Sequence, residues 1–176
     1  MRVYWQGEAL DRLRDGRHAV LVERTLRWLA ADGWLTRTEV TFSEFGERGS
    51  IDVLAFHAAT GALLVVEVKS VVPDLQAMLS SLDRKWRLGR AVAKAVGWQT
   101  GTVSRLLVLP DDRTARRRVA LHAATFDTAL PLRTTAVKRW VRSPAGSIAG
   151  ILFLTDVAHG DHRHGPGARP VGRAAG

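Results

Sequence analysis

The sequence predicts an α/β fold with a mixed central sheet flanked by helices, and three observations support that prediction. Apolar residues recur at helical spacing in two long segments, short apolar runs typical of strands lie between and after them, and turn residues separate the runs. With 176 residues, 46% of them hydrophobic, the chain is long enough for one core and short for two. We therefore expect a single domain over residues 1–157.

The first half of the predicted domain begins with a helix over residues 17–31, which an Asp-Gly pair at 32–33 ends. Residues 36–45 alternate and are rich in threonine, valine and phenylalanine, which indicates a strand. Two apolar runs, residues 51–57 and 62–70, then surround a four-residue turn and predict a hairpin that is buried on both faces.

A long helix follows the hairpin, with Asp74 as its predicted N-cap and an end at Gly97. Residues 104–109 form a short apolar run that Pro110 ends, which is typical of a buried strand. The order of elements is therefore αβββαβ, in a core that covers residues 17–109.

A C-terminal α/β extension is expected over residues 110–157. It should contain helices at 114–124 and 135–142 and a strand at 147–154, whereas the segment up to 133 has no clear pattern. Residues 158–176 are rich in glycine, proline, histidine and charge, which predicts a disordered basic tail.

The chain is strongly basic, with a formal net charge of +9 and a pI near 11.2. Such an excess attracts polyanions, so nucleic acid is the first candidate partner, although an arginine-rich composition alone does not establish it. Cysteine is absent, which excludes disulfides and cysteine-ligated zinc. No signal peptide or membrane-spanning stretch is evident, so we expect a cytoplasmic protein with no membrane partner.

The hairpin carries two acidic residues and a lysine on otherwise apolar strands. Glu67 and Lys69 are two residues apart and therefore share a face of their strand. A four-residue turn pairs His57 with Ala62, and this register sets Asp52 opposite Glu67. Two like charges so placed destabilise a sheet unless something neutralises them. A shift of the strand register by one residue would instead send the two carboxylates to opposite faces of the sheet.

A divalent cation between Asp52 and Glu67 would neutralise both carboxylates. Hard oxygen ligands of this kind suit Mg²⁺ or Mn²⁺. The backbone carbonyl of Val68 could provide a further ligand, and a phosphate of the substrate another. Lys69 would then orient the attacking water or stabilise the charge that builds up on the phosphate. The alternative, solvated strand ends, explains poorly why these residues lie in an apolar hairpin.

Residues 48–70, RGSIDVLAFHAATGALLVVEVKS, resemble the PD-(D/E)xK nuclease superfamily, whose pattern is an aspartate, a hairpin and then Glu-x-Lys. Asp52, Glu67 and Lys69 match the pattern, and Ile51 stands where the family name has proline. The resemblance implies a restriction-endonuclease-like fold with the αβββαβ core. It also implies that the two carboxylates bind the metal and that the lysine assists the nucleophile.

The resemblance suggests two further residues. Many members carry a glutamate on the first helix, and Glu23 matches it, although a surface ion pair with Arg24 or Arg27 is the alternative. Gln76, early on the second helix, resembles an accessory polar residue of some members, and an ordinary exposed glutamine is an equal alternative.

Basic residues gather in two places. The second helix carries a strip that would grip phosphates or simply form a solvated face; its residues are Arg84, Arg87, Arg90 and Lys94. The cluster at 116–118 is weaker evidence of a groove, because three successive helical residues point in different directions.

These features predict a Mg²⁺-dependent deoxyribonuclease of a restriction, repair or defence type, with endonuclease activity favoured over exonuclease activity. One alternative is a non-cleaving DNA-binding regulatory or accessory subunit that retains the nuclease fold. Another is an interaction module inside a restriction or defence complex. A homodimer or a partner protein would then supply specificity for the DNA sequence.

Overall fold

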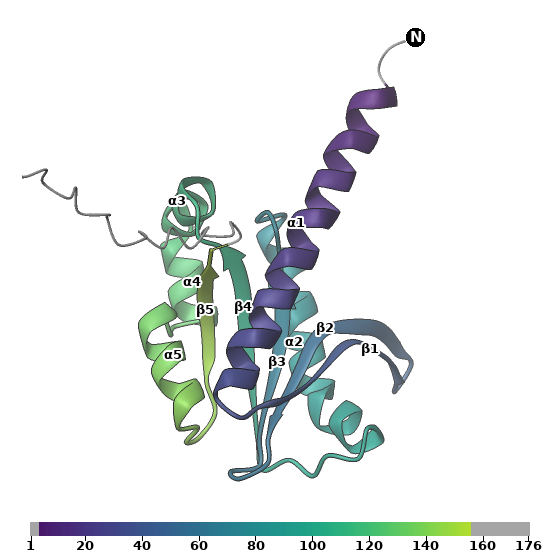
Figure 1. Ribbon diagram of the computed structural model, residues 1–176, viewed down its shortest axis with the longest axis vertical. Helices are drawn as coiled ribbons and strands as arrows, with labels where there is room; N and C mark the ends of the chain where they lie inside the picture. Colours follow the sequence, from purple (N-terminus) through teal and green to yellow (C-terminus); the bar gives the residue numbers. More distant parts are fainter. Residues whose placement is uncertain (1–3, 156–176) are drawn as a thin grey trace, which may run out of the picture.

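The computed structural model describes residues 4–155 as an α/β structure in which helices cover both faces of a central sheet (Figure 1). The order from α1 to β4 is the predicted αβββαβ order. The elements are α1 (Tyr4–Ala31), β1 (Leu35–Glu44), β2 (Glu47–His57), β3 (Ala62–Val68), α2 (Leu75–Ala95), β4 (Thr102–Pro110), α3 (Arg113–Leu121), α4 (Ala123–Ala129), α5 (Thr134–Arg142) and β5 (Ala149–Leu154).

The described strands form one mixed sheet of five in the order β1-β2-β3-β4-β5. The first three strands are antiparallel, and β3, β4 and β5 run parallel. The β2–β3 turn pairs His57 with Ala62, which confirms the predicted register of the hairpin. The β1–β2 ribbon curves away from the rest of the sheet (Figure 1).

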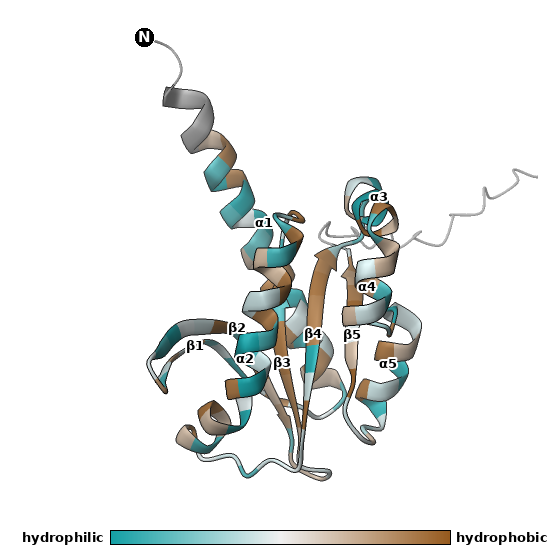
Figure 2. Ribbon diagram, turned by 180° about the vertical axis from the view of Figure 1, so that it is seen from behind, coloured by the Kyte–Doolittle hydropathy of each residue, from teal (hydrophilic) through white to brown (hydrophobic). Residues whose placement is uncertain are grey.

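Two apolar clusters, one on each face of the sheet, form the core. Leu21 and Leu29 of α1 belong to the same cluster as Val137 of α5. Leu82 of α2 and Phe126 of α4 belong to the other cluster. β3 and the carboxyl-terminal half of β4 are largely hydrophobic, whereas a hydrophilic segment interrupts the first half of β4 (Figure 2). Hydrophobic runs of this kind are expected for parallel strands that helices cover on both sides.

Some element boundaries differ from the prediction. α1 begins well before residue 17, and its amino-terminal half extends beyond the sheet, where Leu10 and Leu13 are exposed. Its described residues at 9–16 are all exposed, so this part lacks the buried stripe on which the prediction of a helix depended. The predicted helix at 114–124 is divided at His122 into α3 and α4. The predicted tail, 158–176, lies outside the described residues.

Within residues 4–155, no helix is both long enough and apolar enough to cross a lipid bilayer. Asp74 accepts a hydrogen bond from the Ala77 N–H, which confirms its predicted role as the N-cap of α2.

Gly89 allows α2 to lie directly on the sheet. A Cβ at this position would lie 2.8 Å from Val65 Cγ2 and 3.3 Å from Val103 Cγ1. We expect Gly89→Ala to lower the free energy of unfolding by about 1–2 kcal/mol, because overpacking outweighs the helix propensity that alanine adds.

The matched control is Gly16→Ala in α1, where nothing lies within 4 Å of the added Cβ. Here alanine should raise the free energy of unfolding by up to about 1 kcal/mol, through helix propensity alone. Urea denaturation followed by circular dichroism measures both changes. Stabilisation by Gly89→Ala would contradict the close approach of α2 to β3.

Candidate active site

The carboxyl end of β3 brings the predicted Glu-x-Lys pair together. Glu67 lies on the α2 side of the strand, the side of Leu63 and Val65, and is only 1% exposed. Its Oε1 lies 2.8 Å from Nζ of Lys69. Because the Lys69 side chain is 34% exposed, it links a buried carboxylate to the surface.

Asp52 reaches the same place from β2. Its Oδ2 accepts a hydrogen bond from the Val68 N–H at 2.7 Å. The β2–β3 ladder runs to Val53 and Val66, and the next step of this register sets Asp52 opposite Glu67, as predicted. The N–H and C=O of one strand residue point to the same side, so the Val68 carbonyl also faces β2.

The environment raises the pKa of Asp52 above its ordinary value. Burial is the largest cause, and the negative charge of Glu67 is the second. The Val68 N–H and the positive charges of Lys85 and His18 partly offset these effects on the Asp52 pKa. A carboxyl group so placed favours a proton or a cation beside it.

The backbone is strained directly across from Asp52. Glu39 of β1 has a φ of 47°, in the left-handed region, and the β1–β2 ladder has no pair at this step. Such a conformation costs a residue with a side chain about 1–2 kcal/mol. Strain of this kind concentrates at functional sites, which supports a role for this part of the hairpin.

Lys85 of α2 completes the group, and the sequence analysis missed it. Its Nζ forms an ion pair with Oε2 of Glu67, and its side chain is only 9% exposed. In the sequence it follows Leu82 by three residues and precedes Gly89 by four, so it stands within the apolar stripe of α2. A lysine inside such a stripe is the signal that could have identified it. We call these four residues, Asp52, Glu67, Lys69 and Lys85, the carboxylate–lysine cluster.

Glu23 does not join this cluster in the described structure. Its carboxylate is 60% exposed and pairs with Arg27 on the next turn, which is the surface alternative to a catalytic role. The physical reason is helical rotation: at 3.6 residues per turn, Glu23 points about 140° away from His18, the α1 residue whose charge acts on Asp52.

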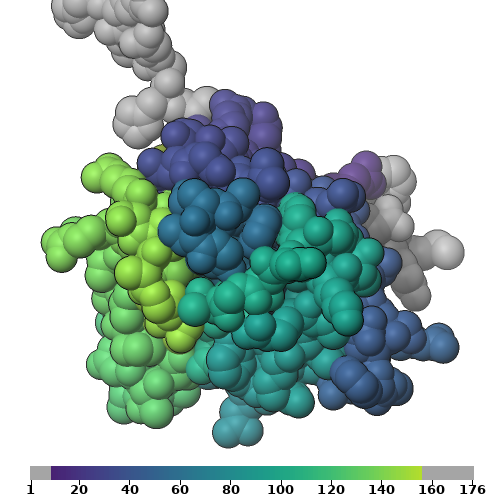
Figure 3. Space-filling model, turned by 90° about the horizontal axis from the view of Figure 1, so that it is seen from below, coloured from purple at the N-terminus to yellow at the C-terminus, as the bar shows by residue number. Residues whose placement is uncertain are grey.

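The basic strip of α2 is largely engaged in contacts within the protein. Arg90 donates to the carbonyls of Thr100 and Gly101 at 2.8 and 2.9 Å. The loop between α2 and β4, to which Thr100 and Gly101 belong, also contacts the β2–β3 turn, because the Gly101 N–H donates to the Gly61 carbonyl at 2.8 Å. Figure 3 shows the two segments side by side. They lie at the opposite end of β3 from Glu67. Among the described residues, Arg84 also forms an ion pair with Glu47, and Arg87 forms one with Asp83.

Lys94 and Gln76 are exposed near opposite ends of α2. Among the described contacts, none joins either residue to the carboxylate–lysine cluster. Their predicted roles in nucleic-acid binding and as an accessory residue stay predictions.

Comparison with protein-family models gives no match for this sequence, and comparison with curated proteins gives no significant one. The case for a function therefore depends on the residues and their geometry.

Proposed function

We propose that this protein is a metal-dependent nuclease of the PD-(D/E)xK type that hydrolyses phosphodiester bonds in DNA. The observation that carries the proposal is the meeting of Asp52 and Glu67 on adjoining strands, with Lys69 2.8 Å from the Glu67 carboxylate. The αβββαβ order supports the restriction-endonuclease-like fold that the sequence resemblance implies. The net charge of +9 suits an anionic substrate.

The residues present fit a hard divalent cation. Asp52 and Glu67 offer carboxylate oxygens, and the raised pKa of Asp52 reflects in part a repulsion that a cation would relieve. Within residues 4–155, no group of three or more His, Asp or Glu side chains could hold a metal by itself. Mg²⁺ does not require such a group, because it binds through one or two carboxylates while water and substrate phosphate complete its shell.

Each residue of the cluster then has a distinct task. Bound Mg²⁺ or Mn²⁺ would supply an activated water and offset negative charge on the scissile phosphate. The Val68 N–H orients Asp52, and Lys85 holds Glu67 from the buried side, which makes Lys85 a positioning residue. Lys69 is the more exposed lysine, so its ammonium is the group that donates to the attacking water or to a phosphate oxygen.

A non-cleaving DNA-binding subunit that retains the nuclease fold is the second candidate. One observation favours it: Lys69 and Lys85 balance the charges of Asp52 and Glu67, so the cluster is neutral without a metal. A protein that only binds DNA could retain the cluster for stability.

The test is to incubate purified protein with supercoiled, linear, single-stranded and branched DNA, in Mg²⁺, in Mn²⁺ or in a chelator. We expect cleavage only with metal, and a rate about a hundredfold lower for Lys69→Ala. Lys138→Ala, which removes an exposed lysine of α5, is the matched control and should cleave as the wild type does.

Binding without cleavage on every substrate would contradict the nuclease proposal and favour the second candidate. Equal rates for Lys69→Ala and Lys138→Ala would contradict the assignment of Lys69.

A further inference from the structure

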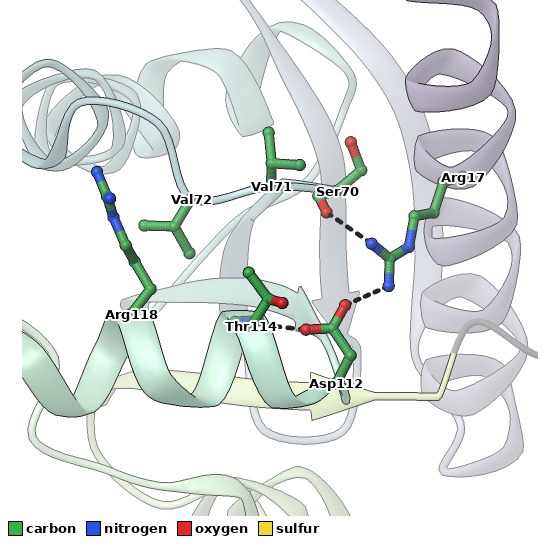
Figure 4. A pocket seen from close by; sticks show the side chains of 8 residues that line it. Arg17, Ser70, Val71, Val72, Asp112, Thr114 and Arg118 are labelled. Carbon is green, nitrogen blue, oxygen red and sulfur yellow. Dashed lines mark hydrogen bonds and ion pairs between the residues drawn. The ribbon is translucent and has the colours of Figure 1, made fainter. Parts of the chain in front are cut away.

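A cavity of about 280 Å³ opens at the carboxyl ends of β3 and β4 (Figure 4). It lies between the segment that follows β3 and the start of α3. Ser70, which lines it, directly follows Lys69 in the chain, so the lining begins one residue beyond the carboxylate–lysine cluster.

Arg17 of α1 forms one wall of the cavity. Its guanidinium forms an ion pair with Asp112 and donates to the Ser70 carbonyl at 3.4 Å, which ties together α1, the end of β3 and the start of α3. Burial would raise the pKa of Asp112, but hydrogen bonds from the Ala115 N–H and from Arg17 lower it overall. Asp112 therefore stays ionised and keeps the Arg17 guanidinium in place at the cavity.

Arg118 of α3 forms the opposite wall. It is exposed, and it has no ion-pair partner among the residues that the structure describes. Figure 4 shows its side chain beside Val72, while Arg17 reaches in from the other side. Val71 and Val72 add apolar surface between the two arginines. Two guanidinium groups around an apolar surface suit a phosphate together with its sugar, because the planar fork of arginine matches phosphate oxygens.

We propose that this cavity is a second phosphate-binding subsite for the nucleic-acid strand, next to the scissile phosphate. The identity of the ligand rests on the proposed function. A strand with one phosphate at Glu67 and Lys69 extends past Ser70 and places another between Arg17 and Arg118. This path crosses the carboxyl ends of β3 and β4, away from the basic strip of α2.

Arg118→Ala and Arg117→Ala form a matched pair for the test. Both residues are exposed arginines of α3, so the two variants lose the same charge, but only Arg118 lines the cavity. Binding of a fluorescent oligonucleotide, single-stranded or duplex, is measured by anisotropy in chelator over a series of salt concentrations. Thermal melts verify that both variants fold.

We expect Arg118→Ala to raise Kd about five- to tenfold and to reduce the slope of log Kd against log salt by about one. Arg117→Ala should change Kd by less than about twofold, since its exposed side chain does not line the cavity and solvent screens its charge. Inorganic phosphate should compete less well against the oligonucleotide in Arg118→Ala than in Arg117→Ala. Equal losses in the two variants would overturn the subsite, because the effect would then follow net charge alone.

The subsite and the nuclease proposal can fail separately. If the wild type never cleaves DNA but binds it in a way that depends on Arg118, the nuclease proposal is overturned and the subsite stands. A wild type that cleaves DNA, with Arg118→Ala binding as Arg117→Ala does, would overturn the subsite alone. A wild type that binds no DNA would overturn both.

Discussion

Asp52→Asn is expected to abolish metal-dependent cleavage and to leave the protein at least as stable as the wild type at neutral pH. Asparagine keeps an oxygen that accepts the Val68 N–H hydrogen bond, but it loses one of the two negative charges that would hold Mg²⁺ at the site. We expect the cleavage rate to fall at least about a hundredfold, because the variant loses a direct metal ligand.

The stability expected of Asp52→Asn follows from the direction of the pKa shift. A carboxyl group whose pKa is higher in the folded chain binds its proton more tightly there, so ionised Asp52 opposes folding. This penalty is absent well below the ordinary pKa of 3.8 and complete above the raised, folded-state pKa. The stability of the wild type relative to Asp52→Asn should therefore fall as the pH rises between these two values.

Thermal unfolding in chelator at acidic and neutral pH measures this difference, and the cleavage assay measures activity. Wild-type cleavage by Asp52→Asn would contradict the metal-ligand assignment. A variant that is inactive because it no longer melts cooperatively would show instead that Asp52 serves the fold.

Glu67→Leu is expected to lower the free energy of unfolding by about 3–5 kcal/mol, which is the usual cost of leaving one partner of a buried ion pair alone. The stranded partner is Lys85, whose side chain is only 9% exposed. Lys69 contributes less to this loss, because its partly exposed side chain can turn to water.

The double variant Glu67→Leu/Lys85→Met should recover most of that loss. Apolar residues of similar volume often replace a buried ion pair at no net cost. Urea denaturation of the two variants and the wild type measures the recovery. A double variant no more stable than Glu67→Leu would contradict the view that the stranded charge of Lys85 causes the loss.

The hairpin and its acidic pair could be predicted from the sequence because their geometry is local. A four-residue turn pairs His57 with Ala62, and the strand period of two then carries the register to Asp52 and Glu67. The order of the core elements was likewise predictable from apolar periodicity and turn residues.

Partners that lie far apart in the chain could not be predicted in this way. Periodicity indicates that Glu23 and Lys85 each have apolar neighbours on a helix, but not how far each helix is rotated about its axis. Packing turns the side of α1 that bears His18, and not Glu23, toward Asp52, and it brings Lys85 to Glu67.

The sequence by itself therefore determined the element order, the hairpin register and the placement of Asp52, Glu67 and Lys69, because these depend on neighbours along the chain. Only the tertiary structure decided that Lys85 pairs with Glu67 and that Arg17 meets Ser70 and Asp112 beside a cavity. Arg17 is separated from those two residues by 53 and 95 positions in the sequence, and such contacts depend on how the helices pack against the sheet, which periodicity along the chain does not specify.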